Sequence, residues 1–210
     1  MSNGQNGILV SGGAFNSIGG TTGGAGNVIS GNHESGLVLS LNTSQNLVQG
    51  NDLGTDVTGK TPLGNSANGI ELSTGAASNT IGGTTAGTGN LISANGQDGV
   101  RISGASGNTF QGNFIGTDVT GKGQLGNGQN GVEISLGFLN AIGGSTTGAG
   151  NKIKFNGGSQ HQIHRRILRK PFGRSFRIWA RRIFFAFHYR VHRQQRNRTV
   201  HHELFRGSRG

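Results

Sequence analysis

Three charged residues recur at one position of a short repeated motif and are the strongest candidates for chemistry. Glu71, Arg101 and Glu133 each stand third in a Gly-Ile/Val-x-Leu/Ile-Ser motif, in copies 30 and 32 residues apart. If the copies stack as neighbouring strands, the two carboxylates lie about 9.5 Å apart, near the separation found in inverting glycosidases. An intervening arginine would lower the pKa of both carboxyl groups, which disfavours a general acid. We therefore favour a surface ladder of opposite charges, contributing about 0.5 kcal/mol per pair.

Two aspartates are candidate calcium ligands. Asp56 and Asp118 occupy the same place in two copies of Gly-Thr-Asp-Val-Thr-Gly-Lys. Carboxylate oxygens suit Ca²⁺, but an aspartate in such a turn commonly bonds the backbone two residues further on. We predict this turn role, and no metal or other cofactor, with Ca²⁺ at these aspartates as the alternative.

The segment 54–61 matches the phosphate-binding P-loop pattern Gly-x4-Gly-Lys-Thr. That chemistry needs a helix directly after the loop, so that its N-terminal amide groups face the phosphates. The following sequence, Pro-Leu-Gly-Asn-Ser, is typical of a turn, and the second copy ends in Gly123 where the motif requires a hydroxyl. We therefore predict no nucleotide site.

A repeat of about 62 residues positions these candidates. The segment 18–27, which begins Ile-Gly-Gly-Thr-Thr, returns at 81–90 and, with one serine, at 142–151. The segment 53–60 returns at 115–122. Each unit contains two turns, because the shorter motif begins every 29 to 33 residues, at Gly7, Gly36, Gly69, Gly99 and Gly131.

Each turn contains three short runs in which apolar residues alternate with others, the period of a β-strand. The first run supplies inward pairs such as Ile70 with Leu72 and Val100 with Ile102. The second and third runs supply two columns: Ile18, Val48, Ile81, Phe110 and Ile142, then Ile29, Leu53, Ile92, Ile115 and Ile153. Asparagines stand two positions before every member: Asn16, Asn46, Asn79, Asn108 and Asn140, then Asn27, Asn51, Asn90, Asn113 and Asn151.

Turns stacked about 4.8 Å apart would superpose these asparagines, whose amides could then bond from turn to turn as ladders. Glycine occupies 42 of 210 positions and would supply the positive φ angles of the corners. Its low helix propensity also argues against a helical fold. The sequence therefore predicts an all-β fold, a parallel β-helix (solenoid) of about five three-strand turns over residues 1–158. The longer connections at 19–26 and 55–68, and their copies, are expected to project as loops from alternate turns.

The motifs IGGTTxGxGN, NxISGN, GNFIGTDxTG and NGVEIS resemble the Gly/Asn-rich right-handed β-helix repeats of large secreted or surface proteins of bacteria, which belong to the pectate-lyase-like superfamily. The resemblance covers residues 1 to about 158. It implies a right-handed coil, an extracellular or cell-surface location, and a chain cut from a longer protein. The start of the chain does not resemble a signal peptide, and no run of eighteen apolar residues occurs.

The composition changes sharply near residue 158. Residues 1–158 carry five Lys/Arg against seven Asp/Glu, whereas residues 159–210 carry fourteen Lys/Arg against Glu203 alone. We treat 159–210 as a separate Arg/Phe-rich tail. Three interpretations stay open: out-of-frame translation; a segment that binds nucleic acid or an anionic membrane; and an independent fold. Because the tail has no periodic apolar face of useful length, we expect it to be poorly ordered.

These observations favour a non-catalytic structural or display solenoid that holds a polysaccharide or a surface protein. A polysaccharide lyase or hydrolase is the alternative, and anion binding through the tail is a third. We predict no nucleic-acid partner unless the tail is genuine, no transmembrane segment, and end-to-end self-association through open strand edges.

Overall fold

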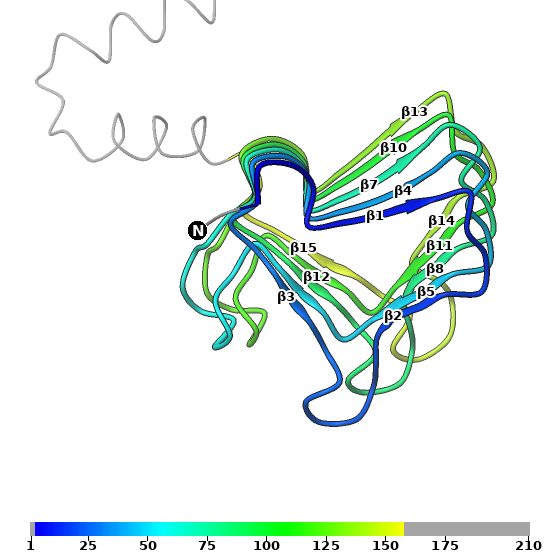
Figure 1. Cartoon of the computed structure of the whole chain (residues 1–210). Coiled ribbons are helices and arrows are strands. Elements are labelled where there is room, and N and C mark those ends of the chain that lie inside the picture. Colours follow the sequence, from blue (N-terminus) through cyan, green and yellow to red (C-terminus); the bar gives the residue numbers. More distant parts are fainter. Residues whose placement is uncertain (1–2, 158–210) are drawn as a thin grey trace, which may run out of the picture. The chain divides into compact units, whose positions relative to one another are not determined.

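The computed structural model describes residues 3–157, which form an all-β parallel solenoid without a helix (Figure 1). Three parallel sheets of five strands run along it. The first sheet contains β1 (Ile8–Ser11), β4 (Leu37–Ser40), β7 (Ile70–Ser73), β10 (Val100–Ser103) and β13 (Val132–Ser135). The second contains β2 (Ser17–Gly19), β5 (Leu47–Gln49), β8 (Thr80–Gly82), β11 (Thr109–Gln111) and β14 (Ala141–Ile142). The third contains β3 (Val28–Ile29), β6 (Asp52–Leu53), β9 (Leu91–Ile92), β12 (Phe114–Ile115) and β15 (Lys152–Ile153). The predicted fold class is confirmed.

Like residues superpose from turn to turn. In the second sheet Val48 pairs with Ile81, and Phe110 pairs with both Ile81 and Ile142. The third sheet repeats this with Leu53 opposite Ile92. These side chains point inward and most are fully buried, so the alternating pattern predicted both the register and the core. The core is a column of aliphatic side chains with one phenyl ring.

Glycine is required where neighbouring turns approach most closely. At Gly69 a Cβ atom would lie 2.7 Å from the carbonyl oxygen of Gly99 and would overlap the side chain of Ile92. At Gly82, φ is +84°, and a Cβ atom would overlap the carbonyl oxygen of Gln111. A side chain at either position would push the turns apart, which explains the high glycine content of the repeat.

Two families of loops leave the solenoid at different corners (Figure 1). The first connects β2 to β3, β8 to β9 and β14 to β15. The second connects β6 to β7 and β12 to β13 and is closed by antiparallel bridges, Thr55 to Pro62 and Thr117 to Gln124. Each family occurs in every other turn, so the loops do project from alternate turns.

The predictions for the basic tail concern residues 159–210, which lie outside the described residues. Within residues 3–157 no helix is long and apolar enough to cross a membrane.

Candidate functional site

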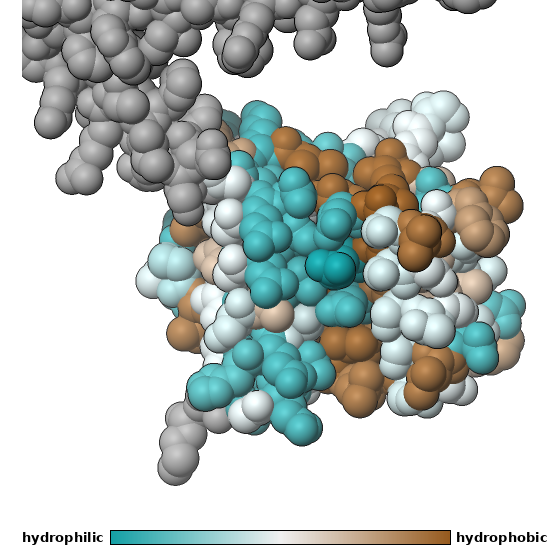
Figure 2. Space-filling model, turned by 90° about the horizontal axis from the view of Figure 1, so that it is seen from above, coloured by the Kyte–Doolittle hydropathy of each residue, from teal (hydrophilic) through white to brown (hydrophobic). Residues whose placement is uncertain are grey.

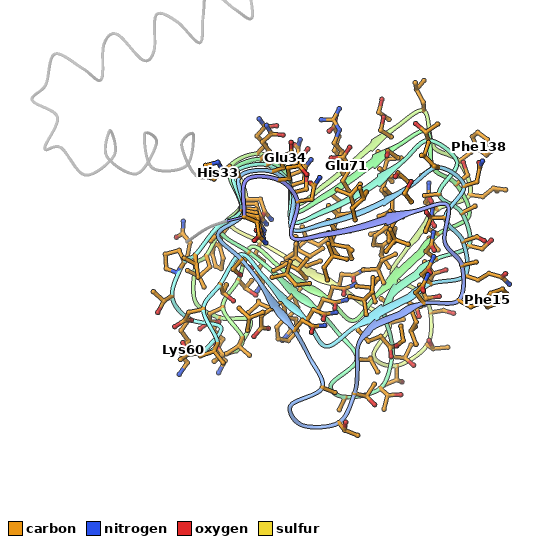
Figure 3. The ribbon with its side chains drawn as sticks, viewed as in Figure 1. Phe15, His33, Glu34, Lys60, Glu71 and Phe138 are labelled. Atoms are coloured by element: carbon orange, nitrogen blue, oxygen red, sulfur yellow. The ribbon has the colours of Figure 1, made fainter. Side chains whose placement is uncertain are left out.

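The structure brings Glu71, Arg101 and Glu133 into one outward column of the first sheet, because Arg101 is in register with both glutamates. Arg101 Nη1 lies 3.4 Å from Glu133 Oε2, with both side chains more than a third exposed. Glu71 points outward (Figure 3) and its Oε2 accepts hydrogen bonds from Asn68 Nδ2 at 3.1 Å and from Ser35 Oγ at 3.4 Å. The column therefore contains a surface ion pair and a separately bonded carboxylate.

On the face seen in Figure 2, hydrophilic residues lie beside exposed hydrophobic ones.

Asp56 and Asp118 each organise their own loop. Asp56 Oδ1 accepts hydrogen bonds from Thr58 Oγ1 at 2.8 Å and from the N–H of Thr61 at 3.1 Å. Asp118 Oδ1 is bonded in the same way by Thr120 Oγ1 at 2.7 Å and by the N–H of Gly123 at 2.9 Å. These bonds, the threonine hydroxyl first, lower the pKa of both carboxyl groups. Residues 3–157 contain no cluster of three His, Cys, Asp or Glu able to hold a metal ion.

The segment that matches the P-loop pattern is the tip of such a loop. Asp56 N–H donates to the carbonyl oxygen of Thr61 at 3.0 Å, which closes the loop on itself. The chain then continues to β7 without a helix, so the arrangement that cradles phosphates is missing from this segment.

Asparagine ladders run along the solenoid at the predicted positions. In both predicted ladders the backbone N–H and the Nδ2 group of one asparagine donate to Oδ1 of the asparagine one turn later. Asn46 and Asn79, at 3.0 and 2.8 Å, represent the first ladder, and Asn90 and Asn113, at 3.0 Å for both bonds, represent the second. The buried amides are thereby paired from turn to turn, which fixes the stacking.

A third ladder was missed by the sequence analysis. It uses the same pair of bonds and consists of Asn32, Asn65, Asn95, Asn127 and Asn156. Its members stand three residues after the third column in odd turns but twelve after it in even turns, because a loop intervenes. Each member but the last stands four residues before the glycine that opens the next turn, and this constant spacing was the available signal.

A fourth polar column lies just before the strands of the first sheet and contains a buried acid. Backbone N–H groups here donate to side chains of the preceding turn, and Asp98 Oδ1 accepts from the N–H and the Nδ2 of Asn130 at 2.8 and 2.9 Å. Asp98 is fully buried and its Oδ2 has no hydrogen-bond partner. An unpaired buried carboxylate oxygen is costly, so this position is a local weakness of the stack.

A groove lies over the third sheet, and the sequence analysis did not identify it. In Figure 1 this sheet lies between the two loop families. Because its strands pair in register, their outward residues form a floor along the solenoid: Val28, Asp52, Leu91, Phe114 and Lys152. The loops at 20–26 and 83–89 line one wall, and Val57 and Val119 of the other loop family contribute to the opposite wall.

Two adjoining cavities of about 550 and 370 Å³ make up the groove and share Gly50, Asp52 and Gly87. Burial raises the pKa of Asp52, and the carboxylate of Asp56 raises it further. The ammonium group of Lys152 lies 4.4 Å from the centre of the Phe114 ring, a cation–π contact at one end of the floor. The floor of the groove thus combines three apolar side chains with one half-buried carboxylate and one ammonium group, and threonine-containing loops form a wall beside it.

Comparisons with protein-family models, curated proteins and solved structures find no match to this chain.

Proposed function

We propose that this chain is a rigid, non-catalytic display solenoid from a secreted or cell-surface bacterial protein, similar to the right-handed β-helix repeats of the pectate-lyase-like superfamily. The observation that carries the proposal is the set of continuous asparagine ladders. They pair the corners of every turn with the next, and such networks make a stack stiff. A stiff stack holds its projecting loops at fixed spacing, as a display function requires.

The state of the acidic residues supports a structural role. Glu133 is engaged by Arg101, and Asp56 and Asp118 by their own loops. A general acid needs a raised pKa, whereas the two loop aspartates have lowered ones. The alternative function, a polysaccharide lyase or hydrolase, would depend on Glu71, Arg101 and Glu133, the charged residues that do share a column.

Sugar release separates the two functions. The full chain is incubated with pectin, alginate and xylan, with and without Ca²⁺, beside a Glu71→Gln variant. We expect no product from either protein. Reducing ends or unsaturated products formed by the wild-type chain and lost in Glu71→Gln would replace the display function with the enzymatic one.

The basic composition of residues 159–210 favours a further function, binding to nucleic acid or anionic membranes. Binding of RNA and of anionic vesicles is compared between the full chain and a chain ending at residue 158. Salt-sensitive binding by the full chain alone would assign anion binding to the tail, and equal binding by both would remove it.

A further inference from the structure

We propose that Asn130, which directly precedes Gly131, is a site of spontaneous deamidation, and that its conversion to aspartate or isoaspartate loosens the start of β13. The inference goes beyond the display function and does not depend on it. Asparagine followed by glycine is the pair most prone to this reaction, because glycine has no side chain to hinder ring closure. The full chain contains seven such asparagines: Asn3, Asn6, Asn68, Asn95, Asn127, Asn130 and Asn156.

The reaction requires only water. The backbone nitrogen of Gly131 loses its proton to solvent and attacks Cγ of Asn130, so that a new C–N bond closes a succinimide ring. The bond from Cγ to Nδ2 breaks, and Nδ2 takes up a proton and leaves as ammonia. Water then opens the ring. Opening at Cγ gives aspartate, whereas opening at the main-chain carbonyl gives isoaspartate, in which the chain runs through Cγ.

The attacking N–H group is already bonded in most of the seven pairs. Five of these glycines donate to a carbonyl oxygen of a neighbouring turn, at 2.8 to 3.1 Å: Gly7, Gly69, Gly96, Gly128 and Gly157. Each of these bonds must break before the nitrogen can attack. Within residues 3–157 the N–H groups of Gly4 and Gly131 have no hydrogen-bond partner. Asn3 and Gly4 are exposed near the start of the chain, so Gly131 is the glycine of the stack that is ready to react.

Asn68 provides a direct comparison, because it occupies the same position of the fourth polar column two turns earlier. Asn68 is buried, and its Oδ1 accepts from the N–H of Asp98 at 3.2 Å. The N–H of Gly69 donates to the carbonyl oxygen of Asp98 at 3.0 Å. The next turn therefore restrains both the amide and the attacking nitrogen.

Asn130 lacks these restraints in the described part of the chain. Its side chain is exposed, and within residues 3–157 no donor reaches its Oδ1. Each amide does donate through Nδ2 to a carboxylate, Glu71 for Asn68 and Asp98 for Asn130, so this bond does not distinguish the two sites. The difference arises because β13 is an edge strand of the first sheet (Figure 1).

Packing retains the reactive glycine. A Cβ atom on Gly131 would overlap the side chain of Ile153 and would lie 2.7 Å from Nδ2 of Asn156. A larger residue would slow ring closure, but it would also push these side chains out of place. Close stacking of the turns therefore imposes the glycine that makes Asn130 reactive.

Deamidation would weaken the link between β10 and β13. The N–H and Nδ2 of Asn130 both donate to Oδ1 of the buried Asp98, at 2.8 and 2.9 Å. A carboxylate at position 130 replaces the Nδ2 donor by an acceptor and places a second negative charge beside the first. Isoaspartate also lengthens the main chain and displaces the carbonyl oxygen that accepts from the N–H of Gly99 at 2.9 Å. We therefore expect the turn that begins at Gly131 to loosen.

The test is peptide mapping by mass spectrometry of the full chain during storage in mildly alkaline buffer, with fragment spectra that separate Asn130 from Asn127. Asn3 is the unrestrained reference and Asn68 the restrained one in the same molecule. We expect Asn130 to deamidate at least about tenfold faster than Asn68, because the site at Asn68 must first open. In denaturant the two rates should become similar. Deamidation of Asn3 without that of Asn130, or a difference from Asn68 that persists in denaturant, would overturn the inference.

Two variants test the consequence for the fold. Asn130→Ser is the matched control, because Ser35 occupies the same position of the column. It has no amide, so the mass gain assigned to position 130 must disappear. Asn130→Asp is one product of the reaction and should have a lower thermal midpoint than Asn130→Ser. Equal midpoints of the two variants would refute the loosening of β13.

Discussion

The backbone N–H and the Nδ2 group of Asn46 both donate to a single atom, Oδ1 of Asn79, at 3.0 and 2.8 Å. Asn79 in turn donates in the same way to Asn108, at 3.0 Å for both bonds. Each buried asparagine is therefore the acceptor for one turn and the donor for the next, so that the ladder is directional. Loss of one interior side chain removes both bonds of the link in which it accepts and the Nδ2 bond of the link in which it donates.

An interior ladder asparagine should matter more than a terminal one. Asn79→Ala removes the acceptor of the buried Asn46 backbone N–H and one of the three acceptors of Asn46 Nδ2, and we expect it to lower the free energy of unfolding by about 3 kcal/mol. Asn16 is exposed and accepts no bond in the described ladder, so Asn16→Ala should cost about 1 kcal/mol. Urea denaturation followed by circular dichroism measures both. Equal losses would show that the ladder does not act as a directional network.

The close approach at Gly69 provides a second test. Gly69→Ala places a methyl group against Ile92 at the end of its own turn and against Gly99 at the start of the next, and should destabilise the chain by about 2 kcal/mol. Gly150→Ala is the control, because no atom lies within 4 Å of the added methyl group. Its thermal midpoint should be unchanged or slightly raised. A Gly69→Ala variant as stable as the wild type would contradict the packing described for this corner.

Asp98 should be replaceable by asparagine but not by alanine. Asp98→Asn keeps an oxygen that can accept from Asn130, so we expect its thermal midpoint to stay close to that of the wild type. Asp98→Ala removes the acceptor and should cost about 1–3 kcal/mol. If Asp98→Asn proves the less stable of the two, the second carboxylate oxygen must have a stabilising partner.

Asp52 and Asp118 should affect the pH dependence of stability in opposite directions. The pKa of Asp52 lies above its ordinary value of 3.8 because of burial, so the folded chain binds this proton more tightly and loses stability as the pH rises above that value. Asp52→Asn should therefore raise the thermal midpoint at about pH 7 and leave it unchanged at about pH 3.

The pKa of Asp118 is lowered by its hydrogen bonds, so its stabilisation is present above pH 3.8 and is lost as the pH falls through the folded-state pKa. Asp118→Asn should accordingly lower the midpoint at neutral pH. Thermal melts of both variants across this pH range test the signs. A shift of the same sign for both would show that the hydrogen bonds or the burial assigned to these groups are wrong.

The sequence alone determined the fold class, the register of the second and third sheets and two of the three ladders. Each asparagine of the column Asn16 to Asn140 stands two residues before a member of the apolar column Ile18 to Ile142. When the strands of a parallel coil stack in register, both columns therefore become stacks of like residues. It also placed Glu71, Arg101 and Glu133 in one column, since all three occupy the same position of one strand motif.

Only the tertiary structure revealed the third ladder, the unpaired oxygen of Asp98 and the groove. The third ladder was hidden because loops of different length separate Asn65 and Asn127 from the strands before them. The groove unites residues from β3, β6, β9, β12 and both loop families, and no repeat motif contains them together. Local patterns fix how a turn stacks on its neighbour. Where the loops lie over a sheet, and hence which side chains share a cavity, is decided by packing between segments far apart in the chain.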